Sequence, residues 1–284
     1  KDAIVYQLHV KSFRDGNADG FGDFRGLIQQ LDYIEQLGAT AIWLLPFYPS
    51  PLRDDGYDIA AYEEINSTYG TVEDFQAFLR AAHERTIKVI TELVINHTSD
   101  QHPWFQRARR APKGSSDRDW YVWSDKRPKD AAKGMIFPGE QESVWSYDKV
   151  ARAWYMHRFY EHQPDLNVAN PAVREEIRKI MGFWLELGVS GFRLDAAPFL
   201  IEQSDRLVLK FSSNEWMMQS LNLTQLAART MSAQQHVIVA GFGRSGQSLA
   251  TLLQQCVEAA YRLSDDLTAR YFAHSGDARQ SLLA

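Results

Sequence analysis

An arginine and an aspartate stand two positions apart near the end of a short apolar segment, residues 191–198 (GFRLDAAP). Side chains alternate between the two faces of a β-strand, so Arg193 and Asp195 share one face. The guanidinium is permanently charged and favours the ionised form of a neighbouring carboxyl group, which lowers the pKa of that group. An ionised carboxylate is the state that a carboxylate nucleophile needs. A plain ion pair that orients the end of a strand would use the same two residues.

Three more polar residues with useful chemistry follow two earlier apolar segments. Asp54 and Tyr57 come after residues 39–45 (ATAIWLL), and His97 follows residues 88–95 (KVITELVI). Continuous apolar runs are typical of parallel strands that are buried on both faces. A lone histidine at such a position is more often structural than functional, so His97 becomes a candidate through its neighbours rather than by itself.

The elements that must position these residues alternate between strand and helix. The patterns predict strands at residues 3–10, 39–45, 88–95 and 191–195, and helices at residues 24–37, 71–82 and 171–187. This alternation favours parallel strands joined by right-handed helical crossovers, as in a barrel or an open doubly wound sheet. The polar residues fall at the carboxyl ends of strands, where barrel enzymes carry their active sites.

Residues 98–170 form a long polar and aromatic segment with weak periodicity, between the third strand and the next helix. A connection of this length is too long for an ordinary loop. We therefore expect a subdomain inserted at about residues 98–170 that lies over a site.

Near the N-terminus, acidic and amide side chains recur at short spacing in residues 15–23 (DGNADGFGD). Asp15, Asn17, Asp19 and Asp23 offer hard oxygen ligands, and the glycines between them permit a sharp turn, as in calcium-binding loops. A solvated acidic turn without a metal would have the same composition. These residues alone leave both alternatives open.

Taken together, residues 1 to about 203 resemble the catalytic barrel of the α-amylase family of glycoside hydrolases. Within that family they are most similar to the trehalose synthase and oligo-1,6-glucosidase branch, which acts on small α-glucosides. The motifs that carry the resemblance occur in order at residues 15–23, 54–58 (DDGYD), 93–100 (LVINHTSD), 163–167 (QPDLN) and 191–198. The resemblance implies a (β/α)8 TIM barrel and a substrate such as maltose or trehalose.

The same resemblance implies a role for each candidate residue. It implies that Asp195 is the nucleophile that forms a covalent glucosyl intermediate, with Arg193 holding it ionised. It further implies that Asp54, Tyr57 and His97 bind the glucose at the cleaved bond. By the same resemblance, the ligands of a Ca2+ ion are Asp15, Asn17, Asp19, Asp23 and the carbonyl oxygen of Phe21.

Two departures from the family pattern affect the expected activity. Glu92 stands where the family usually has aspartate, and its extra methylene leads us to expect disturbed hydrogen bonding to the site. A retaining glycosidase also needs a second carboxylate as its acid. In the family this acid ends the fifth strand, and after about residue 203 the one candidate we find for it is Glu215, which follows Asp195 too closely to end such a strand. We therefore expect very low or no turnover of maltose.

From residue 236 the sequence has another pattern, an apolar strand followed by Gly241, Gly243 and Gly246 (GFGRSG) and a helical stretch. This is the context of the dinucleotide-binding fingerprint, in which backbone N–H groups approach a pyrophosphate. Residues 204–284 resemble the linker and nucleotide-binding domain of potassium-efflux cation/proton antiporters. That resemblance implies NAD or AMP as the ligand and Asp265 as the ribose-binding residue. A glycine-rich turn with no ligand is the alternative.

The sequence thus predicts two partial domains. Residues 1–203 would form about four β/α units of a TIM barrel with the insertion after the third strand, and residues 204–284 a linker and a partial Rossmann-like βαβ unit. Half a barrel leaves strand edges and an apolar face uncovered, which favours self-association unless the tail covers them. The expected function is an α-glucoside hydrolase or glucosyltransferase of little or no activity. A nucleotide-binding regulatory module and a non-functional fusion are the alternatives.

Composition argues against other classes of protein. The net charge of −5 gives no support to nucleic-acid binding. No apolar run approaches the roughly 20 residues of a membrane-spanning helix. Cys256 is the only cysteine, so no internal disulfide can form and a cytoplasmic location is expected. Residue 1 is lysine with no signal-like segment after it, so we expect a piece of a longer product.

Overall fold

The computed structural model describes residues 3–137, 139–196, 199–200 and 236–238. Its main sheet has five parallel strands in the order β1-β2-β3-β7-β8. They are β1 (Val5–Leu8), β2 (Ala41–Leu44), β3 (Lys88–Leu93), β7 (Gly191–Leu194) and β8 (His236–Ile238). Parallel pairing confirms the prediction from the alternation of strands and helices. It also brings the carboxyl ends of β2, β3 and β7 side by side at one end of the strands.

The helices between these strands are α1 (Val10–Phe13), α2 (Phe24–Gln29), α3 (Leu31–Gln36), α4 (Val72–Glu84) and α6 (Pro171–Leu187). The single helix predicted over residues 24–37 is two helices, because the backbone leaves the helical region at Gln30 (φ −111°, ψ 8°). Thr71 and Asp74 form the predicted capping box at the start of α4. α6 ends as predicted at Gly188, whose φ of 108° lies in the left-handed region that glycine tolerates best.

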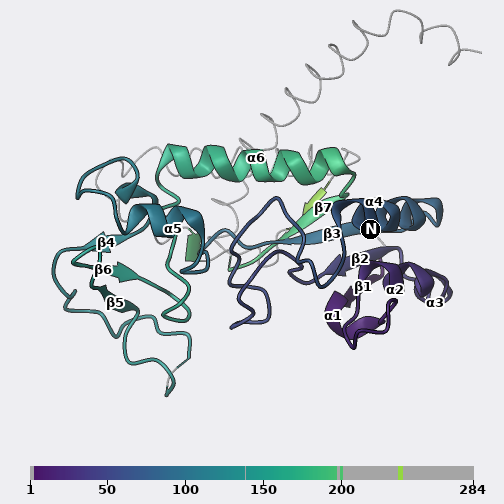
Figure 1. Ribbon diagram of the computed structural model, residues 1–284, viewed down its shortest axis with the longest axis horizontal. Coiled ribbons are helices and arrows are strands. Elements are labelled where there is room, and N and C mark those ends of the chain that lie inside the picture. The colour runs from purple at the N-terminus through teal and green to yellow at the C-terminus, as the bar shows by residue number, and fades with distance from the viewer. Residues whose placement is uncertain (1–2, 138, 197–198, 201–235, 239–284) are drawn as a thin grey trace, which may run out of the picture.

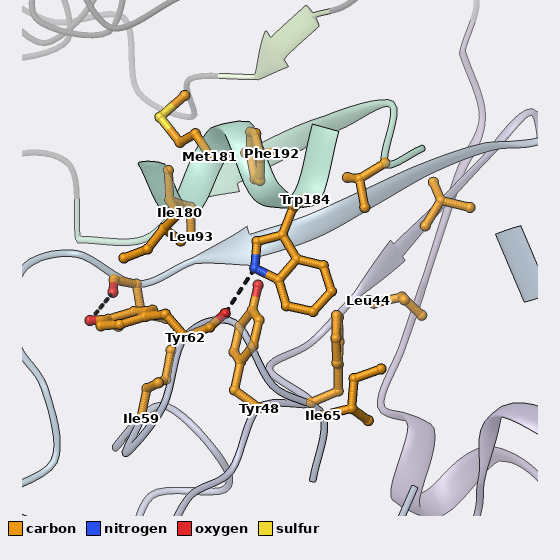
Figure 2. Close-up of a cluster of buried hydrophobic side chains, with 14 of the residues drawn as sticks. Leu44, Tyr48, Ile59, Tyr62, Ile65, Leu93, Ile180, Met181, Trp184 and Phe192 are labelled. Atoms are coloured by element: carbon orange, nitrogen blue, oxygen red, sulfur yellow. Dashed lines mark hydrogen bonds between the residues drawn. The ribbon is translucent and has the colours of Figure 1, made fainter. Parts of the chain in front are cut away.

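Trp184 of α6 packs in the core between that helix and the loop that follows β2 (Figure 2). Its ring meets the rings of Phe47, Tyr48 and Phe75 edge-on, each with 5.4 Å between ring centroids. Its indole nitrogen donates a hydrogen bond to the carbonyl oxygen of Tyr62 at 2.9 Å, so the polar atom of this fully buried side chain is paired. The packing holds α6, and thus the start of β7, against the loop that carries Asp54.

The segment between β3 and α6 has its own small sheet. It contains α5 (Pro103–Ala108), the 3₁₀ helix η1 (Arg118–Trp120) and an antiparallel sheet in the order β4 (Trp123–Ser124), β6 (Ala153–Met156), β5 (Trp145–Asp148). In Figure 1 this sheet and α5 lie at the opposite end of the molecule from α1, α2 and α3. An isolated bridge from His97 to Asp165 ties the last part of the segment back to the end of β3, and a second from Tyr121 to Leu166 ties it to the part of the segment that follows η1.

The strand β8 belongs to the tail that the sequence assigned to a separate Rossmann-like unit. It pairs in parallel with β7, and its three residues lie opposite Gly191, Phe192 and Arg193. The first strand of the predicted second unit therefore extends the main sheet, because the edge of β7 offers its backbone groups partners. The glycine motif at 241–246, Asp265 and Glu215 lie outside the described residues, and the Rossmann-like unit stays a prediction.

The opposite edge of the described sheet is β1, which pairs only with β2 among these strands. Ile4 and Val5 are 57% and 44% exposed there, and Tyr33 and Leu37 on and after α3 are exposed as well. Self-association through such an edge stays a prediction. No helix among the described residues is long and apolar enough to cross a membrane.

Candidate active site

Arg193 and Asp195 extend from the carboxyl end of β7. Nη1 of Arg193 donates a hydrogen bond to Oδ1 of Asp195 at 2.5 Å. The two side chains are 26% and 16% exposed, so they are largely desolvated but retain accessible surface. The sequence predicted this pair from the alternation of side chains along a strand, and the structure confirms it.

Glu92 lies directly opposite Arg193, on the neighbouring strand β3, and its side chain is fully buried. Its Oε1 accepts a hydrogen bond from Nη1 of Arg193, and its Oε2 accepts one from Nε1 of Trp43 at 2.5 Å. The guanidinium carbon of Arg193 also lies 5.1 Å from the centroid of the Trp43 ring, a cation–π contact. The expectation of disturbed hydrogen bonding at Glu92 was wrong, since both of its oxygens have donors from adjacent strands.

Burial is the largest single effect on the pKa values of Glu92 and Arg193. It raises the pKa of Glu92 to about 7, although the hydrogen bond and charge of Arg193 and the Trp43 N–H oppose the rise. Burial lowers the pKa of Arg193, but its bond to Glu92 and the charges of Glu92 and Asp195 outweigh that effect, so the pKa is raised. Arg193 therefore remains a cation that bridges a buried carboxyl group and a more exposed one.

Asp54 lies half-buried in the loop after β2. Its backbone N–H donates to Oδ1 of Asp58 at 3.2 Å, and its own Oδ2 accepts a hydrogen bond from Nε2 of Gln163 at 2.7 Å. Burial raises the pKa of Asp54, the hydrogen bond from Gln163 lowers it, and the charges of Asp58 and Asp195 raise it. Asp54 thus lies within electrostatic reach of the Arg193–Asp195 pair.

His97 follows β3 and is only 1% exposed. Its Nε2 donates to the carbonyl oxygen of Tyr57 at 3.2 Å, and Nδ2 of Asn96 donates to its Nδ1 at 3.5 Å. Burial lowers the pKa of His97 to about 4, against the opposing charge of Asp195. These contacts fit a neutral ring with its proton on Nε2, and that ring packs 5.0 Å from the ring of Phe159.

Tyr57 lies among the same charges. Burial raises the pKa of its phenol, the charges of Glu92, Asp195 and Asp54 raise it further, and the charge of Arg193 lowers it. The loop after β2 and the ends of β3 and β7 therefore bring together the residues expected there from the sequence, which are Asp54, Tyr57, His97, Arg193 and Asp195.

Three residues of this neighbourhood were not candidates from the sequence alone. Trp43 on β2 looks like an ordinary core aromatic, and Phe159 lies in a segment without clear periodicity. Gln163 belongs to the motif at residues 163–167, so its position was marked but its partner was not. A contact between residues 54 and 163 depends on how the inserted segment folds, which no local pattern reports.

Asp195 is a partly exposed carboxylate of this arrangement, and it is hydrogen-bonded to Arg193. Among the described residues, Glu92 and Asp54 are the carboxyl groups whose pKa responds to its charge. Glu92 is fully buried with both oxygens hydrogen-bonded, and Asp54 accepts from Gln163. Both groups are therefore engaged with other side chains, whereas a retaining glycosidase needs a second carboxyl group that is free to protonate the leaving oxygen.

The predicted calcium loop folds back on its own backbone. Asp15 accepts hydrogen bonds from the N–H groups of residues 17, 18 and 20, and the bond from Gly20 does most to lower its pKa. Asp23 is buried and caps α2 by accepting from the N–H of Gly26 at 2.6 Å. In the described part of the chain no three His, Cys, Asp or Glu side chains gather as metal ligands. The oxygen donors of Asp15, Asn17, Asp19 and Phe21 suit Ca2+ by type, so calcium binding there stays a prediction.

The chain is similar in sequence to known proteins over about seven tenths of its length. The family model described as the catalytic domain of alpha amylase matches residues 7–239, past the boundary expected near residue 203. The trehalose synthase of Thermus thermophilus is 55% identical over 203 residues, which are 72% of this chain and 21% of that protein. The oligo-1,6-glucosidase of Parageobacillus thermoglucosidasius is 46% identical over 200 residues, 69% of this chain and 34% of that protein.

Solved structures agree with these sequence relatives. The trehalose-6-phosphate hydrolase of Bacillus licheniformis superposes with a TM-score of 0.63 at 44% identity, covering 68% of this chain and 34% of that one. The isomaltulose synthase of a Klebsiella species gives 0.64 at 43% identity, with 69% and 35% covered. The chain therefore spans about a fifth to a third of the length of the relatives it matches. None of these relatives supports the resemblance to cation/proton antiporters.

Proposed function

Because the chain belongs to the α-amylase family, we propose that it provides the sugar-holding half of an α-glucoside-processing site, with Asp195 as the nucleophile. The substrate class is a small α-glucoside such as maltose or trehalose. Relatives named as trehalose synthases and oligo-1,6-glucosidases support this class, as does a related synthase crystallised with its substrate sucrose. The observation that carries the proposal is the Asp195 carboxylate, hydrogen-bonded to Arg193 beside Asp54, Tyr57 and His97.

The chemistry follows from a partly exposed carboxylate that accepts a hydrogen bond from a cationic guanidinium. Asp195 attacks the anomeric carbon of the glucosyl unit, the bond to the leaving oxygen breaks, and a glucosyl ester forms on the carboxylate. Water or a sugar hydroxyl then attacks the same carbon and releases Asp195. Asp54 accepts hydrogen bonds from sugar hydroxyls, and the neutral His97 and Tyr57 complete the pocket wall.

The leaving oxygen needs a proton, so we propose that the first step, formation of the glucosyl ester, is slow. General acid catalysis contributes about 10²- to 10⁴-fold, and Glu92 and Asp54 are both engaged in other hydrogen bonds. We therefore propose that this chain turns over unactivated glucosides very slowly. The proposal predicts a strong dependence on the leaving group, because fluoride departs without protonation.

The test compares α-glucosyl fluoride with maltose for this 284-residue chain. We expect the fluoride to be consumed at least ~10²-fold faster relative to its uncatalysed rate. Mass spectrometry should find one glucosyl unit on the peptide that holds Asp195, and Asp195→Ala should abolish both signals. Asp117→Ala, at an exposed ion pair with Arg107, is the matched control and should change neither.

Two results would contradict the proposal in different ways. Fast hydrolysis of maltose that Asp195→Ala abolishes would show that an acid is present after all. Fluoride consumption that is equal in the wild type and in Asp195→Ala would remove Asp195 from the role of nucleophile.

A further inference from the structure

Gln163 connects the inserted segment to the proposed sugar site. It lies 109 residues from Asp54 along the chain, yet its Nε2 donates to Oδ2 of Asp54 at 2.7 Å. The Gln163 side chain is completely buried and the Asp54 carboxylate half-buried, so the donor end of this bond lies away from bulk water. A charge-assisted hydrogen bond in such a place is worth more than one at the surface.

The amide of Gln163 has only one orientation that satisfies its neighbours. Its Oε1 accepts from the backbone N–H of Tyr160 at 3.2 Å, which leaves the NH2 group to face Asp54. The backbone N–H of Gln163 donates in turn to the carbonyl oxygen of Tyr160 at 2.9 Å. The turn over residues 160–163 therefore fixes the oxygen end of the amide and leaves its NH2 end facing Asp54.

The segment that carries Gln163 is itself anchored to the end of β3. The N–H of Thr98 donates to the carbonyl oxygen of Pro164 at 3.2 Å, and the N–H of Asp100 donates to that of His162 at 2.8 Å. Two residues after Gln163, Oδ1 of Asp165 accepts from Nδ2 of Asn96 at 3.1 Å. These bonds make the position of Gln163 depend on the same strand end that carries His97.

Asp54 needs a donor because burial and two neighbouring carboxylates oppose its ionisation. Asp58 on its own loop and Asp195 after β7 both repel a second negative charge, and burial adds to the effect. His162 on the inserted segment acts in the other direction. The further ionisable groups whose pKa values respond to Asp54 are Tyr57 and Tyr160. Gln163 is the only side-chain donor to the Asp54 carboxylate among the described residues.

We propose that Gln163 is a positioning residue that orients Asp54 and keeps it ionised, so that the inserted segment sets the affinity of the site for glucosides. The part concerning affinity rests on the proposed function. The part concerning the Asp54 carboxyl group does not. Gln163→Glu adds a third carboxyl group beside Asp54, and Gln163→Leu removes the donor at nearly the same volume.

The experiment measures two quantities in the full chain. The first is the pKa of the Asp54 carboxyl carbon by NMR, assigned with Asp54→Asn. The second is the affinity for maltose and trehalose by calorimetry between pH 4 and pH 8. Gln106→Leu is the matched control, because Gln106 donates a bond of the same length, 2.7 Å, to a backbone carbonyl instead of to Asp54.

Gln163→Leu is expected to raise the pKa of Asp54 and to weaken sugar binding about tenfold at neutral pH, the effect of losing a bond to a charged group. The pH below which binding is lost should move upward, since Asp54 would protonate earlier. Gln163→Glu should move it further, and Gln106→Leu should move neither quantity.

An unchanged Asp54 pKa in folded Gln163→Leu would overturn the inference, whatever the sugar data show. A raised Asp54 pKa, together with a wild type that binds neither sugar, would keep the role of Gln163 and remove the proposed function. A loss of sugar binding with no change in the pH dependence would assign Gln163 a purely structural role and also overturn the inference.

Discussion

Glu92 is the buried carboxyl group on which the stability of this fold should depend most steeply as the pH changes. Its side chain has no exposed surface, and it accepts hydrogen bonds from Arg193 and Trp43. Burial raises its pKa from the ordinary value of 4.5 to about 7. We expect Glu92→Gln to remove one specific component of the pH dependence of the free energy of unfolding.

The sign and size of that component follow from proton linkage. Between pH 4.5 and about 7 the unfolded chain ionises Glu92 while the folded chain keeps it protonated. The folded state thus binds more protons, so its stability is fully present below pH 4.5 and falls as the pH rises toward 7. At about 1.4 kcal/mol per pH unit, the total loss is about 3 kcal/mol, complete shortly above pH 7.

The assay is urea unfolding of the wild type and Glu92→Gln at half-unit intervals from pH 4.5 to pH 8.5. The difference between the two free energies of unfolding should change by about 3 kcal/mol across this range, in the direction that disfavours the wild type at high pH. Histidines that titrate in both proteins cancel in the difference. Glu63→Gln, at an exposed glutamate, is the control and should give a curve parallel to the wild type.

Parallel curves for Glu92→Gln and the wild type would refute the reasoning. They would mean that the donors on both oxygens of Glu92 hold its folded pKa near 4.5, and that burial has little effect.

Other predictions follow from packing and from the acidic loop. Trp184→Ala should lower the free energy of unfolding by about 3–5 kcal/mol in urea unfolding, since it removes the buried ring that packs against Phe47, Tyr48 and Phe75. Gly26→Ala should destabilise strongly because its Cβ would lie 2.1 Å from the carbonyl oxygen of Arg14, whereas Gly182→Ala in α6 meets nothing within 4 Å and should stabilise by about 1 kcal/mol. Millimolar Ca2+ should raise the melting temperature by an amount that a chelator reverses and Asp15→Ala removes; an unchanged melting temperature would leave the loop as a solvated turn.

Most strands of the sheet could be predicted from the sequence, because the patterns that indicate a strand or a helix end are local. The apolar runs at residues 39–45 and 88–95 became β2 and β3, and α6 begins at Pro171 and stops at Gly188, as the positions of proline and glycine indicate. The break at Gln30 was not predicted, because the apolar spacing continues through it. The place of β8 beside β7 was also missed, since a glycine-rich motif after an apolar strand has the same local pattern in two different folds.

In the candidate site, too, local patterns predicted some residues and missed others. Arg193 and Asp195 came from alternation along one strand, and Asp54, Tyr57 and His97 from their places after strands. The partners that hold them, Glu92 and Gln163, come from other elements. A local pattern names the residue with the chemistry but not the residue that holds it. For Glu92 the sequence even suggested the wrong consequence, because the donors that accommodate its longer side chain lie on β2 and β7.

The pairing register of β3 and β7 explains why the chemistry and the stability of this fold are linked. Glu92 lies opposite Arg193, and Leu93 lies opposite Leu194. A slip of one residue would place Thr91 or Leu93 opposite Arg193, and side chains from the other face of β3 would replace the carboxyl group that binds the guanidinium. Arg193 would then face only Asp195, and Glu92 would lose the cation that compensates its burial. The buried pair therefore penalises a slip of one residue, and the observed register satisfies Glu92 while it holds Arg193 against Asp195.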